Sequence, residues 1–185
     1  LGLLALAPFF AVLALLVNLD SRGPVFFSQT RVGERGRHFR CWKIRSMHVD
    51  AEARKAALLA DNEMAGGTTF KMKRDPRITR IGRFIRKASI DELPQLWNVL
   101  IGDMALVGPR PPVPQEVAEY SARAMRRLDV KPGITCIWQV SGRSDIPFEQ
   151  QVELDLRYIS ERSLAYDIKL LLATVPAVLF ARGAY

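Results

Sequence analysis

The stretch that decides the fold and the site reads FKMKRDPRITRIGRFIRKASIDELPQLWNVLIGDMALVGPRPP, from Phe70 to Pro112. An acidic pair, Asp91 and Glu92, stands inside this stretch, and a proline-rich segment that carries Arg110 follows the pair. Basic side chains precede the pair almost without interruption: Lys71, Lys73, Arg74, Arg77, Arg80, Arg83, Arg86 and Lys87. Two adjacent carboxylates among guanidinium groups favour chemistry on a phosphorylated substrate.

The acidic pair has two interpretations. Ser89-x-x-Glu92 has the spacing of a helix capping box, and Asp91 could itself cap a helix with Pro94 in its first turn, so that both acids only start a helix. The same position also suits chemistry, because a helix N-terminus and nearby arginines stabilise a carboxylate. An ionised Asp91 could attack phosphorus as a nucleophile, and Glu92 could hold Mg²⁺ or handle a proton.

The basic residues have two interpretations as well. Four of the arginines are typical of a surface that faces solvent or lipid headgroups: Arg77, Arg80, Arg83 and Arg86. Arg86 lies nearest the acids, and the prolines on both sides of Arg110 lower the entropy cost of positioning its guanidinium. The full set of candidate phosphate ligands adds two residues by position alone and comprises Arg45, Arg86, Arg110 and Arg143.

Composition restricts the partners of the chain. With 185 residues the chain is long enough for about one domain with an appendage, and its net charge of +8 indicates an anionic partner. Nucleic acid, anionic lipid and a phosphorylated small molecule all satisfy that charge. Cys41 and Cys136 lie far apart and are typical of reduced thiols, although spacing alone leaves a disulfide open. No group of His and Cys residues has zinc spacing.

Both ends of the chain are apolar. Residues 1–19 read LGLLALAPFFAVLALLVNL and carry no charge, so at about 1.5 Å per residue they could just cross a hydrocarbon core about 30 Å thick. Pro8 permits either a kinked spanning helix or a helix that bends and returns to the same face. Leu170–Phe180 is too short to span, is interrupted by Pro176, and fits an interfacial helix or a buried core helix.

Between these ends the pattern predicts an α+β fold that is mostly helical and contains a short β-hairpin. The hairpin strands are expected at residues 25–29 and 39–44, around a turn at residues 33–36. A further strand is expected at residues 134–140 and a loop at residues 64–69. Helices are expected at residues 50–62, 79–87, 94–100, 115–128 and 148–160.

These residues resemble the bacterial sugar transferases, which are monotopic phosphoglycosyl transferases that load a polyprenyl phosphate with a sugar 1-phosphate. The resemblance covers most of the chain in the family's order. It rests on LDSRGPVFFSQTRVG (19–33), KIRSM (43–47), DPRITRIGRFIRKASIDELPQLWNVLIGDMALVGPRP (75–111), KPGITCIWQVSGR (131–143) and LDLRYISERSLAYDIKLL (154–171).

The resemblance implies a reaction. Asp91 would attack the sugar-bearing phosphate of a nucleotide diphosphate sugar, usually a UDP-sugar, so that UMP leaves and a phosphosugar–enzyme intermediate forms. A polyprenyl (undecaprenyl) phosphate would then accept the phosphosugar. Asp91 and its partner Glu92 would hold the required Mg²⁺, and Arg86, Arg110 and Arg143 would contact phosphate groups. The reaction would be the first membrane step of exopolysaccharide, capsule or O-antigen synthesis.

The resemblance also implies a location. Residues 1–19 would form a re-entrant helix bent at Pro8, and residues 20–185 a compact cytosolic catalytic domain with interfacial amphipathic helices. This domain would lie against membrane lipid on the cytoplasmic face of the bacterial inner membrane. Two residues depart from the family pattern: Ala7 replaces a frequent serine, and Arg162 a common tryptophan. The ending Arg182–Tyr185 resembles members that transfer galactose or glucose 1-phosphate.

Two other classes compete with the enzyme. The first is a membrane-tethered basic module that binds anionic lipid or nucleic acid. Aromatic residues are not interleaved with the basic stretch, as stacking on single strands would require, so no nucleic-acid partner is expected. The second is an inactive structural homologue, against which the intact Asp91, Glu92 and Arg110 argue. The oligomeric state stays open, a homodimer included.

Overall fold

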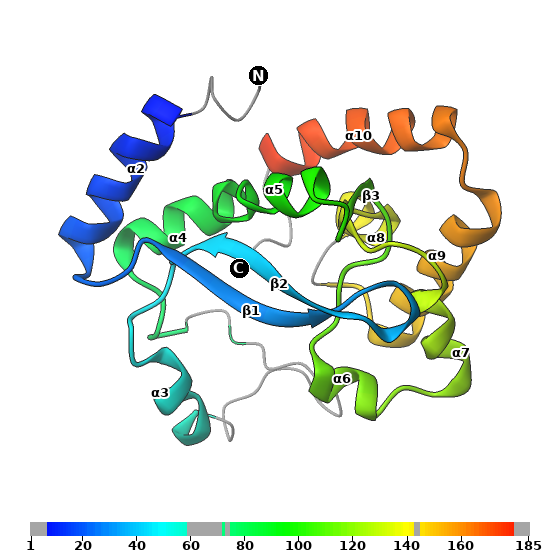
Figure 1. The fold of residues 1–185 in the computed structure, drawn as a ribbon, viewed down its shortest axis with the longest axis horizontal. Helices are drawn as coiled ribbons and strands as arrows, with labels where there is room; N and C mark the ends of the chain where they lie inside the picture. Colours follow the sequence, from blue (N-terminus) through cyan, green and yellow to red (C-terminus); the bar gives the residue numbers. More distant parts are fainter. Residues whose placement is uncertain (1–6, 59–71, 73–74, 143–144, 180–185) are drawn as a thin grey trace.

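A β-hairpin lies at the centre of the fold and carries helices on several sides (Figure 1). The computed structural model describes residues 7–58, 72, 75–142 and 145–179. Strands β1 (Phe26–Val32) and β2 (His38–Ile44) pair antiparallel, in a register that runs from Phe26 opposite Ile44 to Val32 opposite His38. The short helix η1 (Glu34–Gly36) forms the turn between them. The predicted hairpin is therefore confirmed.

The N-terminal helices pack on one end of the hairpin. Helix α2 (Ala7–Asp20) contacts α4 (Arg80–Lys87), and together with β2 they enclose a core of Leu13, Val17, Ile44 and Ile85. Helix α4 confirms the helix predicted at residues 79–87, and Thr79 caps it, because its hydroxyl accepts from Gly82 N at 2.9 Å. A Cβ atom at Gly82 would lie only 1.9 Å from Ser46 O, so glycine permits this close approach. Helix α3 (Ala51–Ala57) confirms the described part of the helix predicted at residues 50–62.

Helix α5 (Gln95–Leu100) crosses beside β2 and confirms the helix predicted there. Asn98, which is fully buried, fixes this packing through its side chain. Its Oδ1 accepts from Trp42 N at 3.1 Å, and its Nδ2 donates to Arg40 O at 2.8 Å. Because the short helix η3 (Ile90–Glu92) comes just before α5, this attachment also sets the distance between η3 and the hairpin.

The chain then forms a second, parallel sheet of two short strands. Strand β3 (Ala105–Val107) pairs with β4 (Gly133–Thr135), and a Cβ atom at Gly133 would lie 2.1 Å from Gly108 N. The strand predicted at residues 134–140 is wrong after Thr135, where α8 (Ile137–Ser141) begins. Cys136, Ile137 and Trp138 are buried in a row, and a short apolar run does not by itself distinguish a buried strand from a buried helix.

The helix predicted at residues 115–128 is three short pieces: α6 (Pro114–Ala118), α7 (Ala122–Met125) and η4 (Arg126–Asp129). Ser121 explains the interruption. Its hydroxyl accepts from Ala124 N at 3.2 Å and so starts a new helix, an alternative that serine side chains offer to a continuous helical ladder.

Two longer helices complete the fold. Helix α9 (Phe148–Glu161) confirms the predicted helix, and α10 (Leu164–Leu179) runs on through Pro176, which was expected to interrupt it. One side of α10 packs Leu170 into a core with Val107, Ile137 and Tyr158. The opposite side leaves apolar side chains exposed: Leu164, Ile168, Leu172, Val175 and Leu179. The sequence allowed either a buried core helix or an interfacial helix here. In the structure α10 has a buried side and an exposed apolar side.

None of the helices formed by the described residues is both long and apolar enough to cross a membrane. Pro8 lies within α2. Because residues 1–6 lie outside the described residues, the bend expected at Pro8 stays a prediction. The loop predicted at residues 64–69 and the end of the helix predicted at 50–62 also lie outside them.

Candidate active site

The acidic pair follows a residue in the left-handed backbone conformation. Helix α4 ends at Lys87, Ala88 caps it, and Ser89 (φ 54°, ψ 21°) turns the chain into η3. The capping interpretation is wrong, because Ser89 makes no side-chain cap hydrogen bond and the N-cap of α5 is Pro94 rather than Asp91. A capping side chain needs extended backbone at its own residue, which Ser89 does not have. Asp91 and Glu92 therefore lie inside a tight turn.

Asp91 is buried, with 7% of its surface exposed. Burial raises the pKa of Asp91, and the neighbouring Glu92 charge raises it as well. Lys43 and Arg86 act in the opposite direction but do not fully offset burial. Asp91 is therefore a carboxylate whose ionised form depends on the cations placed around it.

Glu92 has the opposite character. Its Oε1 accepts from Lys43 Nζ at 2.6 Å, which joins η3 to β2. Burial alone would raise the pKa of Glu92, but the charges of Lys43 and Arg110, the hydrogen bond from Lys43 and the charge of Arg31 outweigh it and lower that pKa. The environment thus separates the two neighbouring acids, and such separation is how sites assign different roles to two carboxylates.

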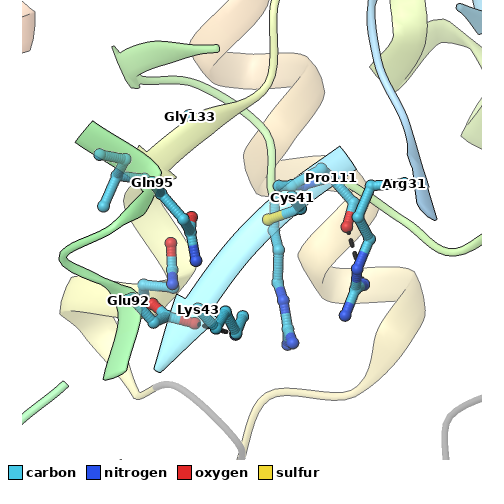
Figure 2. A pocket seen from close by; sticks show the side chains of 10 residues that line it. Arg31, Cys41, Lys43, Glu92, Gln95, Pro111 and Gly133 are labelled. Atoms are coloured by element: carbon cyan, nitrogen blue, oxygen red, sulfur yellow. Dashed lines mark hydrogen bonds and ion pairs between the residues drawn. The ribbon is translucent and has the colours of Figure 1, made fainter. Parts of the chain in front are cut away.

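A small pocket opens beside Glu92 (Figure 2). Its cavity of about 10 Å³ has room for a single water molecule. Cationic side chains outnumber the acidic one in its wall, so the pocket favours an anion. The polar residues that line it are Arg31, Lys43, Glu92, Gln95, Arg110 and Gln139.

Two of the predicted phosphate ligands reach this region. Arg110 is exposed at the pocket, and Arg86 is half-buried and close enough to lower the pKa of Asp91. Arg45 is not brought to the acids. Its guanidinium donates to Pro24 O at 2.6 Å, to Ser21 Oγ at 2.8 Å and to the Ser21 carbonyl, so it holds the turn after α2. Arg143 lies outside the described residues.

The basic stretch is only partly the solvated surface that was expected. Arg80 and Arg83 are exposed. Arg77 is 5% exposed, and its guanidinium forms a salt bridge of 2.6 Å with Asp75 that is buried on both sides. The expectation of a solvated Arg77 is therefore wrong, because Asp75, two residues earlier, provides an anionic partner inside the protein.

Sequence reasoning missed Lys43, Arg31 and Gln95. Strand alternation could have found the first two, since side chains two residues apart on a strand share a face. The register pairs Gln29 with Cys41, which puts Arg31 and Lys43 on the same face of the hairpin. That this face would meet Glu92 depends on the attachment of α5 by Asn98, and the sequence pattern carries no sign of it.

The acids can supply only part of a metal site. Within residues 7–58, 72, 75–142 and 145–179, no three His, Cys, Asp or Glu side chains gather as metal ligands. Mg²⁺, however, takes one or two carboxylates and completes its octahedron with water and substrate phosphate oxygens. Asp91 and Glu92 fit such a shared site, although Oε1 of Glu92 is already engaged by Lys43.

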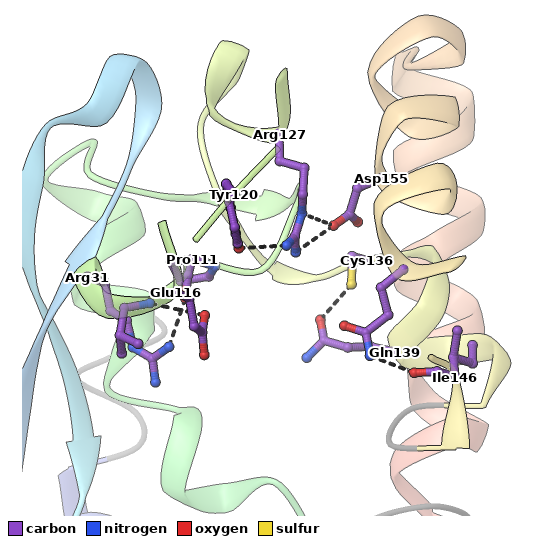
Figure 3. A network of polar contacts seen from close by, with 11 residues as sticks. Arg31, Pro111, Glu116, Tyr120, Arg127, Cys136, Gln139, Ile146 and Asp155 are labelled. Carbon is purple, nitrogen blue, oxygen red and sulfur yellow. Dashed lines mark hydrogen bonds and ion pairs between the residues drawn. The ribbon is translucent and has the colours of Figure 1, made fainter. Parts of the chain in front are cut away.

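A second polar network lies behind the pocket (Figure 3). Arg127 donates through Nε to Asp155 Oδ2 at 2.8 Å and through Nη1 to Tyr120 Oη at 2.8 Å. Asp155 is fully buried, and burial raises its pKa to about 6 against the opposing influence of Arg127. The network connects η4 to α9, and α8 supplies Gln139 to the pocket wall.

The sequence profile of the family described as bacterial sugar transferase matches residues 1–181 of the chain. The chain therefore belongs to the bacterial sugar transferase family, whose members are enzymes.

Characterised relatives agree with this assignment. Galactosyl transferase CpsE of Streptococcus agalactiae is 56% identical over 163 residues, which are 88% of this chain and 36% of CpsE. The undecaprenyl-phosphate galactose phosphotransferase of Salmonella typhimurium is 46% identical over 166 residues, 88% of this chain and 35% of the relative. Exopolysaccharide production protein ExoY of Sinorhizobium fredii is 38% identical over 188 residues, 100% of this chain and 83% of ExoY. The chain thus spans little more than a third of the first two relatives.

Proposed function

We propose that this chain transfers a sugar 1-phosphate from a nucleotide diphosphate sugar, a UDP-hexose, to polyprenyl phosphate. The observation that carries the proposal is the meeting of Glu92, Lys43 and Arg110 at a positively charged pocket. Asp91 stands next to Glu92 in the chain, and Arg86 is close enough to lower its pKa. A relative named undecaprenyl-phosphate galactose phosphotransferase supports the lipid acceptor, and the exopolysaccharide relative supports a role in polysaccharide synthesis.

The chemistry is two displacements at one phosphorus atom. A carboxylate oxygen of Asp91 bonds to the sugar-bearing phosphorus, the bond from that phosphorus to the bridging oxygen breaks, and UMP leaves with the electron pair. An oxygen of polyprenyl phosphate then bonds to the same phosphorus and the bond to Asp91 breaks. The products are polyprenyl diphosphate sugar and free Asp91, so atoms and electrons balance.

The protein side chains have distinct tasks in these steps. Lys43 and Arg86 favour the ionised form of Asp91, which burial opposes. Arg110 is free to meet the diphosphate, because among the described residues it forms no hydrogen bond or salt bridge. Glu92 stays ionised and positions Lys43. Mg²⁺, held by Asp91 and Glu92 together with substrate oxygens, would neutralise phosphate charge during both displacements.

The acceptor is a lipid, and the surface suits a membrane. The exposed apolar side of α10 and the exposed Phe9, Val12, Leu15 and Leu19 of α2 offer lipid-facing surface. In the proposed arrangement these helices lie at the cytoplasmic face of the bacterial inner membrane, with residues 1–19 re-entrant and bent at Pro8.

A nucleotide-release assay tests the function. The detergent-solubilised chain is mixed with a panel of UDP-hexoses, with Mg²⁺ or with a chelator, and UMP and the intact protein mass are measured. We expect Mg²⁺-dependent UMP release and a phosphosugar adduct, both lost in Asp91→Asn and kept in Asp50→Asn, the same change at an exposed position. Full activity of Asp91→Asn would exclude the nucleophile. A chain that only binds anionic lipid would release no UMP.

A further inference from the structure

The segment Pro109–Pro112 is held to the rest of the protein by its carbonyl groups. Pro109 O accepts from Gly133 N at 2.9 Å, and Pro112 O accepts from Val32 N at 2.9 Å. Pro111 O accepts from Nη1 of Arg31 at 2.9 Å. Because proline also fixes φ, the backbone that carries Arg110 has little remaining freedom.

Of these attachments, two are made by backbone N–H groups, which almost any sequence would supply. The third depends on the identity of a side chain. Arg31 has 9% of its surface exposed, and its Nη2 also donates to Gln29 Oε1 at 2.8 Å. The planar guanidinium thus joins its own strand to the carbonyl next to Arg110 (Figure 2). A lysine ammonium is a point charge and does not present this rigid fork.

Burial of the charged Arg31 side chain is energetically unfavourable. Among the described residues Arg31 forms no salt bridge, and burying a guanidinium without one is unfavourable. Burial and the charge of Arg110 together lower the pKa of Arg31 to about 10. The two guanidinium groups therefore repel each other across the pocket wall.

We propose that Arg31 is a positioning residue, which fixes the Pro111 carbonyl and thereby directs Arg110 into the pocket beside Glu92 and Lys43. Arg31 does not itself touch substrate, since its two terminal nitrogens are engaged by protein acceptors. The proposal rests on the proposed function in one respect: Arg110 is taken to bind the diphosphate of the nucleotide sugar.

A double-mutant cycle tests this role. Arg31→Lys keeps the charge and removes the fork, and Arg110→Lys does the same at the residue it would position. We expect Arg31→Lys alone to lower kcat/KM for UMP release about ten- to hundredfold, mainly through KM, as loss of a charge-assisted hydrogen bond predicts. In the Arg110→Lys background the same change should cost less than about twofold. If the losses in kcat/KM of the two single variants instead multiply in the double variant, Arg31 does not position Arg110.

A second measurement does not depend on activity. Val32 N is bonded to Pro112 O, so its amide hydrogen exchange reports how firmly the segment is held. We expect Arg31→Lys to accelerate exchange at Val32 and at Gly133, whose N–H groups hold Pro112 O and Pro109 O, about tenfold or more. The control Arg40→Lys, an exposed position on the same hairpin, should leave both rates unchanged. Unchanged exchange in Arg31→Lys would overturn the positioning role, whether or not the wild type releases UMP. Absence of UMP release by the wild type would contradict the proposed function alone.

Discussion

Lys43 Nζ lies 2.6 Å from Glu92 Oε1, and this contact ties the central hairpin to the turn that carries both acids. Each side chain is about three-quarters buried, with 22% and 24% exposed. The contact makes the acidic pair unequal: Glu92 is engaged and held ionised, and Asp91 beside it keeps its oxygens for other partners. An adjacent pair that looks symmetrical in sequence is therefore divided by one lysine.

Replacing Lys43 with methionine should remove this division. The pKa of Asp91 would rise further, because Lys43 is the charge that most lowers it, and the pocket would lose one of its cations. We expect kcat/KM for UMP release to fall about a hundredfold, the effect of removing one preorganised charge from such a site. Lys43→Arg should retain part of the wild-type kcat/KM. Lys87→Met, on the exposed side of α4, should leave kcat/KM nearly unchanged. An unchanged kcat/KM in Lys43→Met would show that Lys43 takes no part in UMP release.

Ser89 occupies a left-handed backbone conformation (φ 54°) that glycine adopts freely and β-branched residues avoid. We expect Ser89→Gly to keep or raise the free energy of unfolding, by up to about 1 kcal/mol, and Ser89→Val to lower it by about 1–2 kcal/mol. Chemical denaturation of both variants measures these changes. Activity should follow the same order, since Ser89 sets the start of η3. A Ser89→Val variant as stable as the wild type would show that the turn adopts another conformation.

Asp155 should make stability depend on pH. Because burial raises its pKa from 3.8 to about 6, the folded chain binds this proton more readily than the unfolded chain. Its contribution to stability is thus full below 3.8 and lost as the pH rises through about 6. The loss amounts to something on the order of 3 kcal/mol.

Asp155→Asn tests this dependence. The groups that face Asp155 are Arg127, Tyr120, Trp138 and Cys136. Asp155→Asn removes this titration and leaves a neutral oxygen acceptor beside Arg127 at every pH. The difference between wild type and variant, measured in urea from about pH 4 to about pH 7, should shrink as the pH rises. A difference that grows with pH would mean that Arg127 outweighs burial.

The exposed side of α10 should bind lipid. Leu172→Glu with Val175→Glu places two charges on this face, where each exposed apolar side chain can contribute about 1.5–3 kcal/mol on burial. We expect co-sedimentation with vesicles of phosphatidylethanolamine and phosphatidylglycerol to fall at least about tenfold. Ala53→Glu on the exposed face of α3 is the control for added charge. Equal binding of the double variant would place the lipid contact elsewhere.

Local signals carried much of the fold. The hairpin, α4 and α9 were predictable because turn residues, strand-forming side chains and helical periodicity agree over each segment. The strand expected after Thr135 and the single helix expected at residues 115–128 were wrong, because burial of α8 and the hydroxyl of Ser121 decide those segments. Neither factor can be read from periodicity.

The candidate site was also only partly predictable from the sequence. Asp91, Glu92, Arg86 and Arg110 could be found because they cluster along one stretch. Lys43 and Arg45 stand two residues apart in one motif, and the sequence does not tell which of them meets the acids. Packing decides: the turn after α2 engages Arg45, and the end of β2 brings Lys43 to Glu92.

The attachment of Pro109 to Gly133 has a consequence for the order of synthesis. On the ribosome, both acids and Arg110 are made before β4. Until Gly133 has emerged, the segment that carries Arg110 lacks the strand on which it rests. A nascent chain therefore contains Asp91 and Arg110 before their pocket is assembled, and the pocket is complete only when β4 pairs with β3.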